Sequence, residues 1–173
     1  MPINGLSFSE WLESLNRTLD DYYGVRPVNL TEHFLDVELG VAGCSQRILD
    51  NATFLCREVL EPIRNHYQKP IRVHDGYRDA GHNRRVGGKP TSWHLFDGSH
   101  AAADFHVIGV DLKESFDWIR LESALPFDKV ILELSLGVPA TIHVQVDCLA
   151  MPRRLAYTGG VGDSQNYQSV TVA

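Results

Sequence analysis

The sequence predicts one domain of the α+β class, with a mostly antiparallel sheet flanked by helices. Stretches with helical periodicity come early in the chain and the better strand patterns come late, so the two do not alternate as in a parallel fold. A length of 173 residues, with 43% hydrophobic and 22% charged residues, suits one globular domain. We expect residues 1–150 to form this domain and residues 151–173 to form a loosely held C-terminal tail that could add a strand at residues 169–172.

Apolar residues that recur every three or four positions predict three helices, at residues 7–23, 51–67 and 112–124. Pro62 lies inside the second helix and should kink or interrupt it, because proline removes a backbone hydrogen bond and clashes with the preceding turn. A shorter helix could span residues 79–86, before a turn at Gly87 and Gly88. Thr31 could cap one further helical turn.

Short apolar or alternating stretches predict four strands, at residues 71–74, 101–108, 128–134 and 141–146. Strict alternation in the last of them places Ile142 and Val144 on one face and His143 on the other. The pattern therefore turns His143 away from the apolar core.

Composition excludes several classes of protein. A net charge of -6 argues against a nucleic-acid partner, because phosphate contacts need clustered Lys and Arg. No stretch approaches the roughly 18 apolar residues of a membrane span. The first residues carry Glu10 and Glu13 and no positive start, so we expect no signal peptide and a protein that is cytoplasmic at synthesis. Three cysteines without close spacing favour a reducing compartment.

Residues 73–105 concentrate metal-binding side chains. They hold four of the eight histidines, Asp104 and a turn rich in arginine and glycine. A hydrolytic zinc site needs three His, Asp or Glu ligands, an open position for water, and a nearby carboxylate that can take a proton. The sequence offers His94, Asp104 and His143 as ligands and Glu133 as that carboxylate.

The order of several short motifs between about Leu30 and Val146 resembles the zinc D-alanyl-D-alanine carboxypeptidases. These are the M15 peptidases, which share their fold with the hedgehog signalling domain. The motifs are Gly76-Tyr77-Arg78, Asn83, Val86-Gly87-Gly88, Ser92-x-His94, Ala101 to Asp104, Phe127-Asp128 with Ile131 and Glu133, and His143-Val144. The likeness extends to Pro62, in the helix end before the first predicted strand.

This resemblance implies a Zn²⁺ cofactor and a peptide substrate from bacterial peptidoglycan. The activity would be that of a D-Ala-D-Ala carboxypeptidase or of an endopeptidase of the endolysin type, in a bacterial enzyme or a phage lysis or tail enzyme. Such a protein could be released to the cell wall or be associated with a virion. The implied roles are zinc ligand for His94, Asp104 and His143, catalytic carboxylate for Glu133, substrate or oxyanion contact for Arg78, and substrate contact for Ser92.

Two departures from the family pattern leave alternatives open. The segment between His94 and Asp104 is three residues longer than the usual spacing, and His100 within it could replace His94 as ligand, because His100 and Asp104 share one face of an extended chain. Many relatives also place an acid three residues before the last histidine, where this chain has Ala140. Glu133 is then the only candidate general base.

Simpler roles remain for these residues. Glu133 could be a surface charge at a strand end, and Arg78 could merely pair with Asp75 or Asp79. Four further histidines, His33, His74, His82 and His106, fit structural or solvent-facing positions better than ligand positions. The alternative function is a non-catalytic metal-binding or assembly module on the same fold. The sequence gives no prediction of the oligomeric state.

Overall fold

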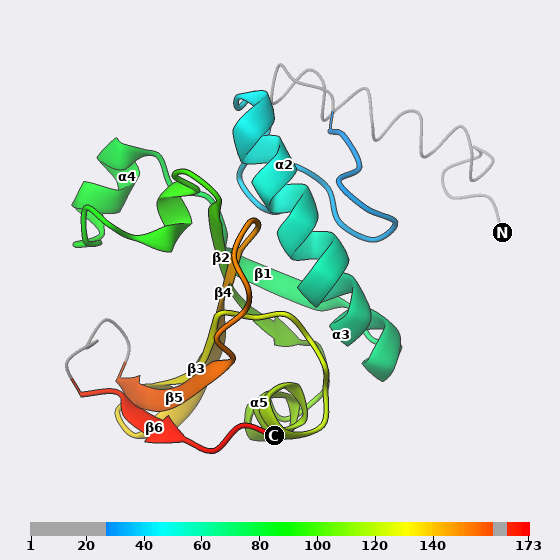
Figure 1. The fold of residues 1–173 in the computed structure, drawn as a ribbon, viewed down its shortest axis with the longest axis vertical. Helices are drawn as coiled ribbons and strands as arrows, with labels where there is room; N and C mark the ends of the chain where they lie inside the picture. The colour runs from blue at the N-terminus through cyan, green and yellow to red at the C-terminus, as the bar shows by residue number, and fades with distance from the viewer. Residues whose placement is uncertain (1–26, 161–165) are drawn as a thin grey trace, which may run out of the picture.

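A six-stranded sheet forms the centre of the protein (Figure 1), whose computed structural model describes residues 27–160 and 166–173. The strand order is β1-β2-β4-β3-β5-β6, and all neighbours are antiparallel except β3 and β5, which are parallel. The strands are β1 Ile71–Asp75, β2 His100–Val107, β3 Lys129–Ser135, β4 Val138–Asp147, β5 Leu155–Gly160 and β6 Gln168–Val170. The predicted α+β class with a mostly antiparallel sheet is therefore confirmed.

One long helical segment and one shorter helix cover the same face of this sheet. The long segment joins α2 Gln46–Leu55, the π-helical turn η1 Cys56–Leu60 and α3 Glu61–Tyr67. The shorter helix is α5 Leu112–Leu121, while α4 Ala80–Arg85 and the 3-10 turn η2 Trp93–Leu95 lie between β1 and β2 in sequence. Figure 1 shows α4 on the side of the sheet away from α2 and α3. Within the described residues, no helix is both long and apolar enough to cross a membrane.

Pro62 interrupts the long helix as predicted, by means of the π-helical turn that precedes it. The turn η1 ends at Leu60, and Pro62 then occupies the first turn of α3. A proline has no N–H for the helical ladder and its ring crowds the carbonyl one turn back, whereas it is tolerated in the first turn of a helix. The wider turn thus lets the chain restart its hydrogen bonding at Glu61. The helical segment begins at Gln46, five residues before the predicted start.

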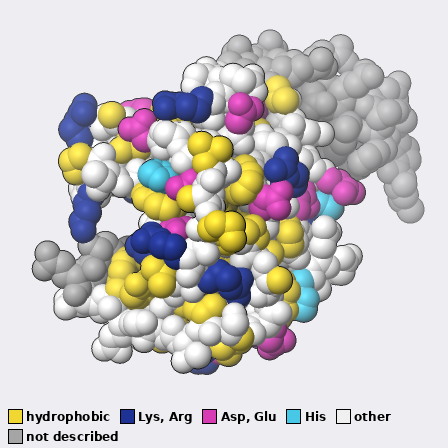
Figure 2. Space-filling view, viewed as in Figure 1, with side chains coloured by type: hydrophobic (Ala, Val, Ile, Leu, Met, Phe, Trp, Pro, Cys, Tyr) yellow, Lys and Arg dark blue, Asp and Glu magenta, His cyan; other side chains and the backbone are white. Residues whose placement is uncertain are grey.

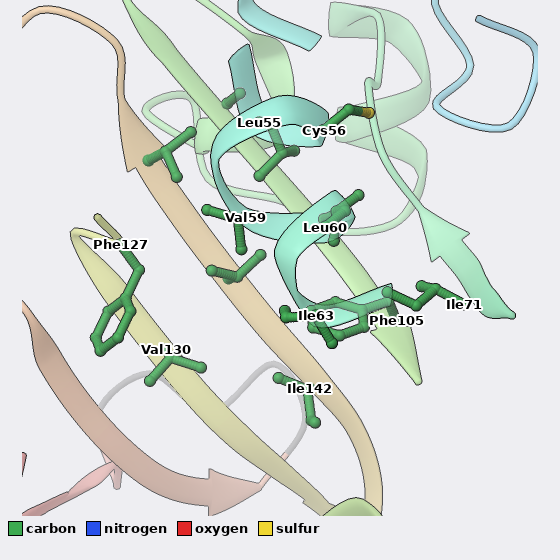
Figure 3. Packing of buried hydrophobic residues seen from close by; sticks show 14 of the residues in the cluster. Leu55, Cys56, Val59, Leu60, Ile63, Ile71, Phe105, Phe127, Val130 and Ile142 are labelled. Carbon is green, nitrogen blue, oxygen red and sulfur yellow. The ribbon is translucent and has the colours of Figure 1, made fainter. Parts of the chain in front are cut away.

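Alternation along the strands divides the sheet into an apolar face and a polar face. Val130 and Leu132 on β3 and Ile142, Val144 and Val146 on β4 belong to the buried core. Figure 3 shows side chains from the helical segment, among them Val59 and Ile63, directed toward this face of the strands. The side chains between these core positions must therefore project from the other face of the sheet.

Several sequence-based expectations need correction. No helical turn forms at residues 30–34, where an isolated bridge between Asn29 and Leu35 closes a bend instead. Helix α5 ends at Leu121, three residues early. The predicted helix at residues 7–23 lies outside the described residues.

The described part of the predicted C-terminal tail contains two strands of the sheet. The expected late strand is present as β6, and β5 adds a strand that the sequence did not indicate. Two arginines hold the entry to β5: Arg153 makes a two-point ion pair with Asp128, and the Arg154 guanidinium lies 4.7 Å from the Phe127 ring centroid. These contacts join residues far apart in the chain, so no local sequence pattern could predict β5.

Asn51 of α2 binds the backbone of the long connection between His94 and Asp104. The buried Asn51 carboxamide donates from Nδ2 to the carbonyl oxygens of Phe96, Gly98 and His100, at 3.3, 3.1 and 3.2 Å. The two N–H groups of one amide are thus shared among three backbone acceptors of one loop. The three extra residues are an ordered part of the fold.

Replacing Asn51 by alanine should lower the free energy of unfolding by about 1–3 kcal/mol, because buried carbonyl groups lose their donor. Urea denaturation of the wild type and the variant measures this change. The matched control is Asp50→Ala, one residue away and exposed, which should change stability by less than about 0.5 kcal/mol. Equal stability of the Asn51 and Asp50 variants would show that the amide does not hold the loop.

Candidate metal centre

Three side chains with metal-binding atoms meet on the polar face of the sheet. They are His94, Asp104 and His143, and one ligand atom of each lies within 4.8 Å of the others. Asp104 on β2 is directly opposite His143 on β4 in the antiparallel register, and His94 comes from the turn η2. The distances are 2.6 Å from His143 Nδ1 to Asp104 Oδ1, 3.4 Å from His94 Nε2 to His143 Nδ1, and 3.6 Å from His94 Nε2 to Asp104 Oδ2.

His94 is fixed in the tautomer that a metal ligand needs. Its Nδ1 donates a hydrogen bond of 2.7 Å to the carbonyl oxygen of Gly76, so the Nε2 lone pair faces the other two residues. The side chain is buried, with 4% of the residue exposed. Burial, followed by the effect of His143, lowers the pKa of His94 to about 4. The imidazole is therefore neutral near pH 7, as metal binding requires.

Gln145 supports His143 from two residues along β4. Its Nε2 lies 2.9 Å from Nε2 of His143, on the side of the ring away from Asp104. A carboxamide carries both a donor and an acceptor, so a half-turn of its end group lets Gln145 stabilise either tautomer of the ring. Nδ1 of His143 can thus donate to Asp104 or, with the proton on Nε2, bind a cation.

A guanidinium group balances the buried carboxylate of Asp104. Arg78 Nη2 lies 3.6 Å from Asp104 Oδ2, and Arg78 Nε donates to Asp75 Oδ2 at 2.6 Å. Burial raises the pKa of Asp104, but the hydrogen bond and charge of His143, with His94 and Arg78, lower it overall. Asp104 is therefore an anion near neutral pH. Arg78 pairs with Asp75, which is the simpler role that the sequence suggested for it. It also lies beside the cluster, close to Asp104.

His100 is placed away from this cluster. Its ring stacks on Trp93 with centroids 4.2 Å apart, and its Nε2 lies 3.5 Å from Asp147 Oδ2. It precedes Asp104 by four residues on the same strand, or about 13 Å at strand spacing. The structure thus brings His94, and not His100, together with Asp104 and His143.

Glu133 lies on the same face, on β3. It pairs with Thr141 in the β3–β4 ladder, two residues from His143, and only 8% of the residue is exposed. Burial raises the pKa of Glu133, and the charge of Asp104 adds to this effect, while a hydrogen bond from Tyr167 opposes it. A buried carboxyl group does not fit the simpler prediction of a surface charge at a strand end.

Tyr167 is the contact that sequence reasoning missed. Its hydroxyl donates to Glu133 Oε1 at 2.8 Å. Gly159 on β5 provides the space for the ring, because a Cβ at that position would lie 2.4 Å from Tyr167 Cδ1. No local pattern relates Tyr167 to Glu133; only the parallel pairing of β3 with β5 brings the C-terminal segment over the site.

The remaining predicted residues take different places. Ser92 is the N-cap residue of η2, two residues before His94, and its N–H donates to Lys89 O at 3.0 Å. His33 contacts Glu61 through Nδ1 at 2.9 Å, and His74 contacts His106 at 2.7 Å. Cavities of about 420 and 550 Å³ lie beside α2, and their linings contain no residue of the cluster.

The donor set fits a zinc ion. Two neutral imidazole nitrogens and one carboxylate form a three-ligand set of the kind that catalytic zinc sites use, with a fourth position left for water. A regular tetrahedron with bonds near 2.05 Å has edges of about 3.3 Å, close to the two longer separations in this cluster. Second contacts to Gly76 and Gln145 already orient both histidines.

Zinc analysis of purified variants tests this ligand set. We expect His94→Ala to lose most of its bound zinc, because losing one of three ligands leaves too few bonds, and His100→Ala to keep it. Inductively coupled plasma mass spectrometry of both variants and the wild type gives the stoichiometry. Loss of zinc from the His100 variant alone would mean that the ligand is wrongly assigned.

Comparison with known families agrees with this geometry. A family model described as Peptidase M15 matches residues 25–133, which is more than half of the chain and includes Arg78, His94, Asp104 and Glu133. The match stops before His143 and Tyr167, which the structure adds to the site. No curated protein matches the chain. The matched share and the arrangement of the site lead to one conclusion: this chain belongs to the M15 peptidase family.

Proposed function

We propose that this protein is a zinc peptidase that hydrolyses D-amino-acid-containing peptides of bacterial peptidoglycan, as a carboxypeptidase or as an endopeptidase of the endolysin type. Membership of a zinc-dependent peptidase family supports the peptidase activity. The observation that carries the proposal is the buried Glu133 beside the cluster of His94, Asp104 and His143. Release to the cell wall or association with a virion would both bring the protein to this substrate.

His94, Asp104 and His143 would hold the zinc ion. A zinc ion supplies Lewis acidity, which polarises a carbonyl group and makes water lose a proton near neutral pH. Glu133 takes the proton from the attacking water and later gives it to the leaving amine. Its raised pKa suits this exchange, because a base that must also act as an acid works best with a pKa near the working pH.

Arg78 and Ser92 would act on the substrate. The guanidinium of Arg78 is held by Asp75 next to Asp104, so its positive charge is fixed beside the reacting carbonyl group. A fixed cation stabilises the negative charge that develops on the carbonyl oxygen. Ser92 precedes His94 by two residues at the start of η2, where its hydroxyl can contact the bound peptide.

A non-catalytic module would be favoured by a fourth protein ligand that closes the zinc site. His100, the histidine between His94 and Asp104 in sequence, lies instead against Trp93 and Asp147. Among the described residues, the only group of three or more side chains placed to hold a metal ion contains no fourth member. This arrangement favours the enzyme.

Cleavage of purified peptidoglycan and of a D-Ala-D-Ala peptide should depend on both the metal and Glu133. We expect a chelator to abolish cleavage, zinc to restore it, and Glu133→Gln to reduce kcat by about 100-fold or more, because the variant cannot take a proton. Zinc content should be unchanged in the Glu133 variant, which separates proton transfer from metal loss. Activity that survives both treatments would refute the mechanism.

Tyr167 should act as a positioning residue for Glu133. We expect Tyr167→Phe to lower kcat about tenfold and to leave KM, zinc content and thermal stability nearly unchanged, because only the hydroxyl that orients Glu133 is lost. Steady-state kinetics on the same peptide measures the change. Tyr67→Phe provides the control, since Tyr67 lies on α3 and packs against the core on the opposite face of the sheet. A rise in KM with constant kcat would assign Tyr167 to substrate binding.

A further inference from the structure

Lys129 lies on the same face of the sheet as the metal centre. On β3, Lys129 pairs with Gln145, Ile131 pairs with His143, and Glu133 pairs with Thr141. Lys129 and Glu133 are therefore on opposite sides of the row that contains the metal ligands. Lys129 is two positions along β3 from Ile131, the β3 residue in that row, which corresponds to roughly 7 Å along the strand.

The Lys129 ammonium is half-buried and has no carboxylate bonded to it among the described residues. It lies 5.8 Å from the ring centroid of Tyr157 on β5, within the range of a cation–π contact. The adjacent Asp128 uses both of its carboxylate oxygens to bind Arg153, at 2.7 and 2.6 Å. The nearest acid is thus already neutralised by another cation.

Further positive charges surround this lysine. Burial is the largest cause that lowers the pKa of Lys129, followed by Arg153, while Asp128 opposes the shift and Lys89 adds to it. A half-buried cation without a bonded carboxylate gains free energy when an anion binds to it. The position of Lys129 on this face, with no bonded acid among the described residues, is therefore compatible with an anion-binding role.

Figure 2 shows a hollow between the part of the protein that carries α4 and the part that carries β5 and β6, with Lys or Arg side chains on both sides. A histidine and acidic side chains lie at its inner end in this view. Lys89, in the loop after α4, is near enough to Lys129 to contribute to the lowering of its pKa.

We propose that Lys129 binds a carboxylate of the peptide substrate, about two residues from the bond that is cut. The inference rests on the proposed peptidase function and specifies that the peptide substrate carries a negative charge near the bond that is cut. An extended peptide advances about 3.3–3.6 Å per residue, so the 7 Å offset of Lys129 from the metal row corresponds to two residues. The preferred substrates are then acidic peptides, with the carboxylate bound to the Lys129 ammonium that Tyr157 holds.

Matched synthetic stem peptides test this specificity. One peptide carries a glutamyl residue with a free carboxylate two residues from the scissile bond, and the other carries a carboxamide there. We expect the wild type to cleave the carboxylate peptide with a kcat/KM about tenfold higher, the gain of one charge-assisted hydrogen bond. Lys129→Met should remove this ratio by slowing cleavage of the carboxylate peptide only, and Lys129→Arg should keep most of it.

The control variant is Lys69→Met. Lys69 is exposed in the turn before β1, at the opposite edge of the sheet from β5, so this change removes the same charge away from the hollow. It should leave the ratio as in the wild type. Equal cleavage of both peptides by the wild type, or an equal slowing of both by Lys129→Met, would overturn the proposal.

A binding measurement separates this proposal from the proposed function. If the wild type cleaves neither peptide, the assigned activity is wrong for these substrates, and titration calorimetry on the zinc-loaded protein decides the lysine's role. Binding of the carboxylate peptide about tenfold tighter than the carboxamide peptide, with the difference lost in Lys129→Met, supports the subsite. Equal affinities refute it.

Discussion

The antiparallel pairing of β2 with β4 is the constraint on which the site depends. This register sets Asp104 directly opposite His143, and the same register sets Phe105 opposite Ile142 in the core. A slip of one residue would turn Asp104 into the core and Phe105 toward solvent, since side chains alternate between the faces of a strand. Burial of the apolar face by the helices thus also fixes the register of the polar face. The same register brings Asp104 and His143 together.

Charge balance sets what else must be present around Asp104. A buried carboxylate is costly unless it is paired, and here two imidazoles and one guanidinium surround it. The guanidinium in turn is held by Asp75, and His94 by the carbonyl of Gly76, so the residues after β1 serve the site as a group. The motif Gly76-Tyr77-Arg78 is therefore a structural support for the ligands as well as a source of one functional side chain.

The sequence predicted the parts of the fold that depend on local patterns. Alternation at Ile142, His143 and Val144 predicted both the strand and the face on which His143 lies, and the break at Pro62 followed from the chemistry of proline. It did not predict β5, because that strand owes its place to Asp128, Phe127 and the edge of β3. The choice between His94 and His100 was open because the motif Ser92-x-His94 favoured one and strand periodicity allowed the other. The contacts of the Asn51 amide and the stack of His100 on Trp93, which no local pattern predicts, place His100 away from the cluster.

The strands beyond the family match supply neighbours to the residues of the proposed site. A parallel neighbour for β3 aligns Gly159 with Glu133 and Tyr157 with Ile131, so one strand leaves room for a ring beside the catalytic carboxylate and places another ring beside Lys129. The metal ligands come from η2, β2 and β4, and none of them depends on β5 directly. In the proposed mechanism β3 thus carries both Glu133 and Lys129, and β5 supplies neighbours to each of them. Changes in the C-terminal strands could then alter the preferred peptide without disturbing the zinc ligands.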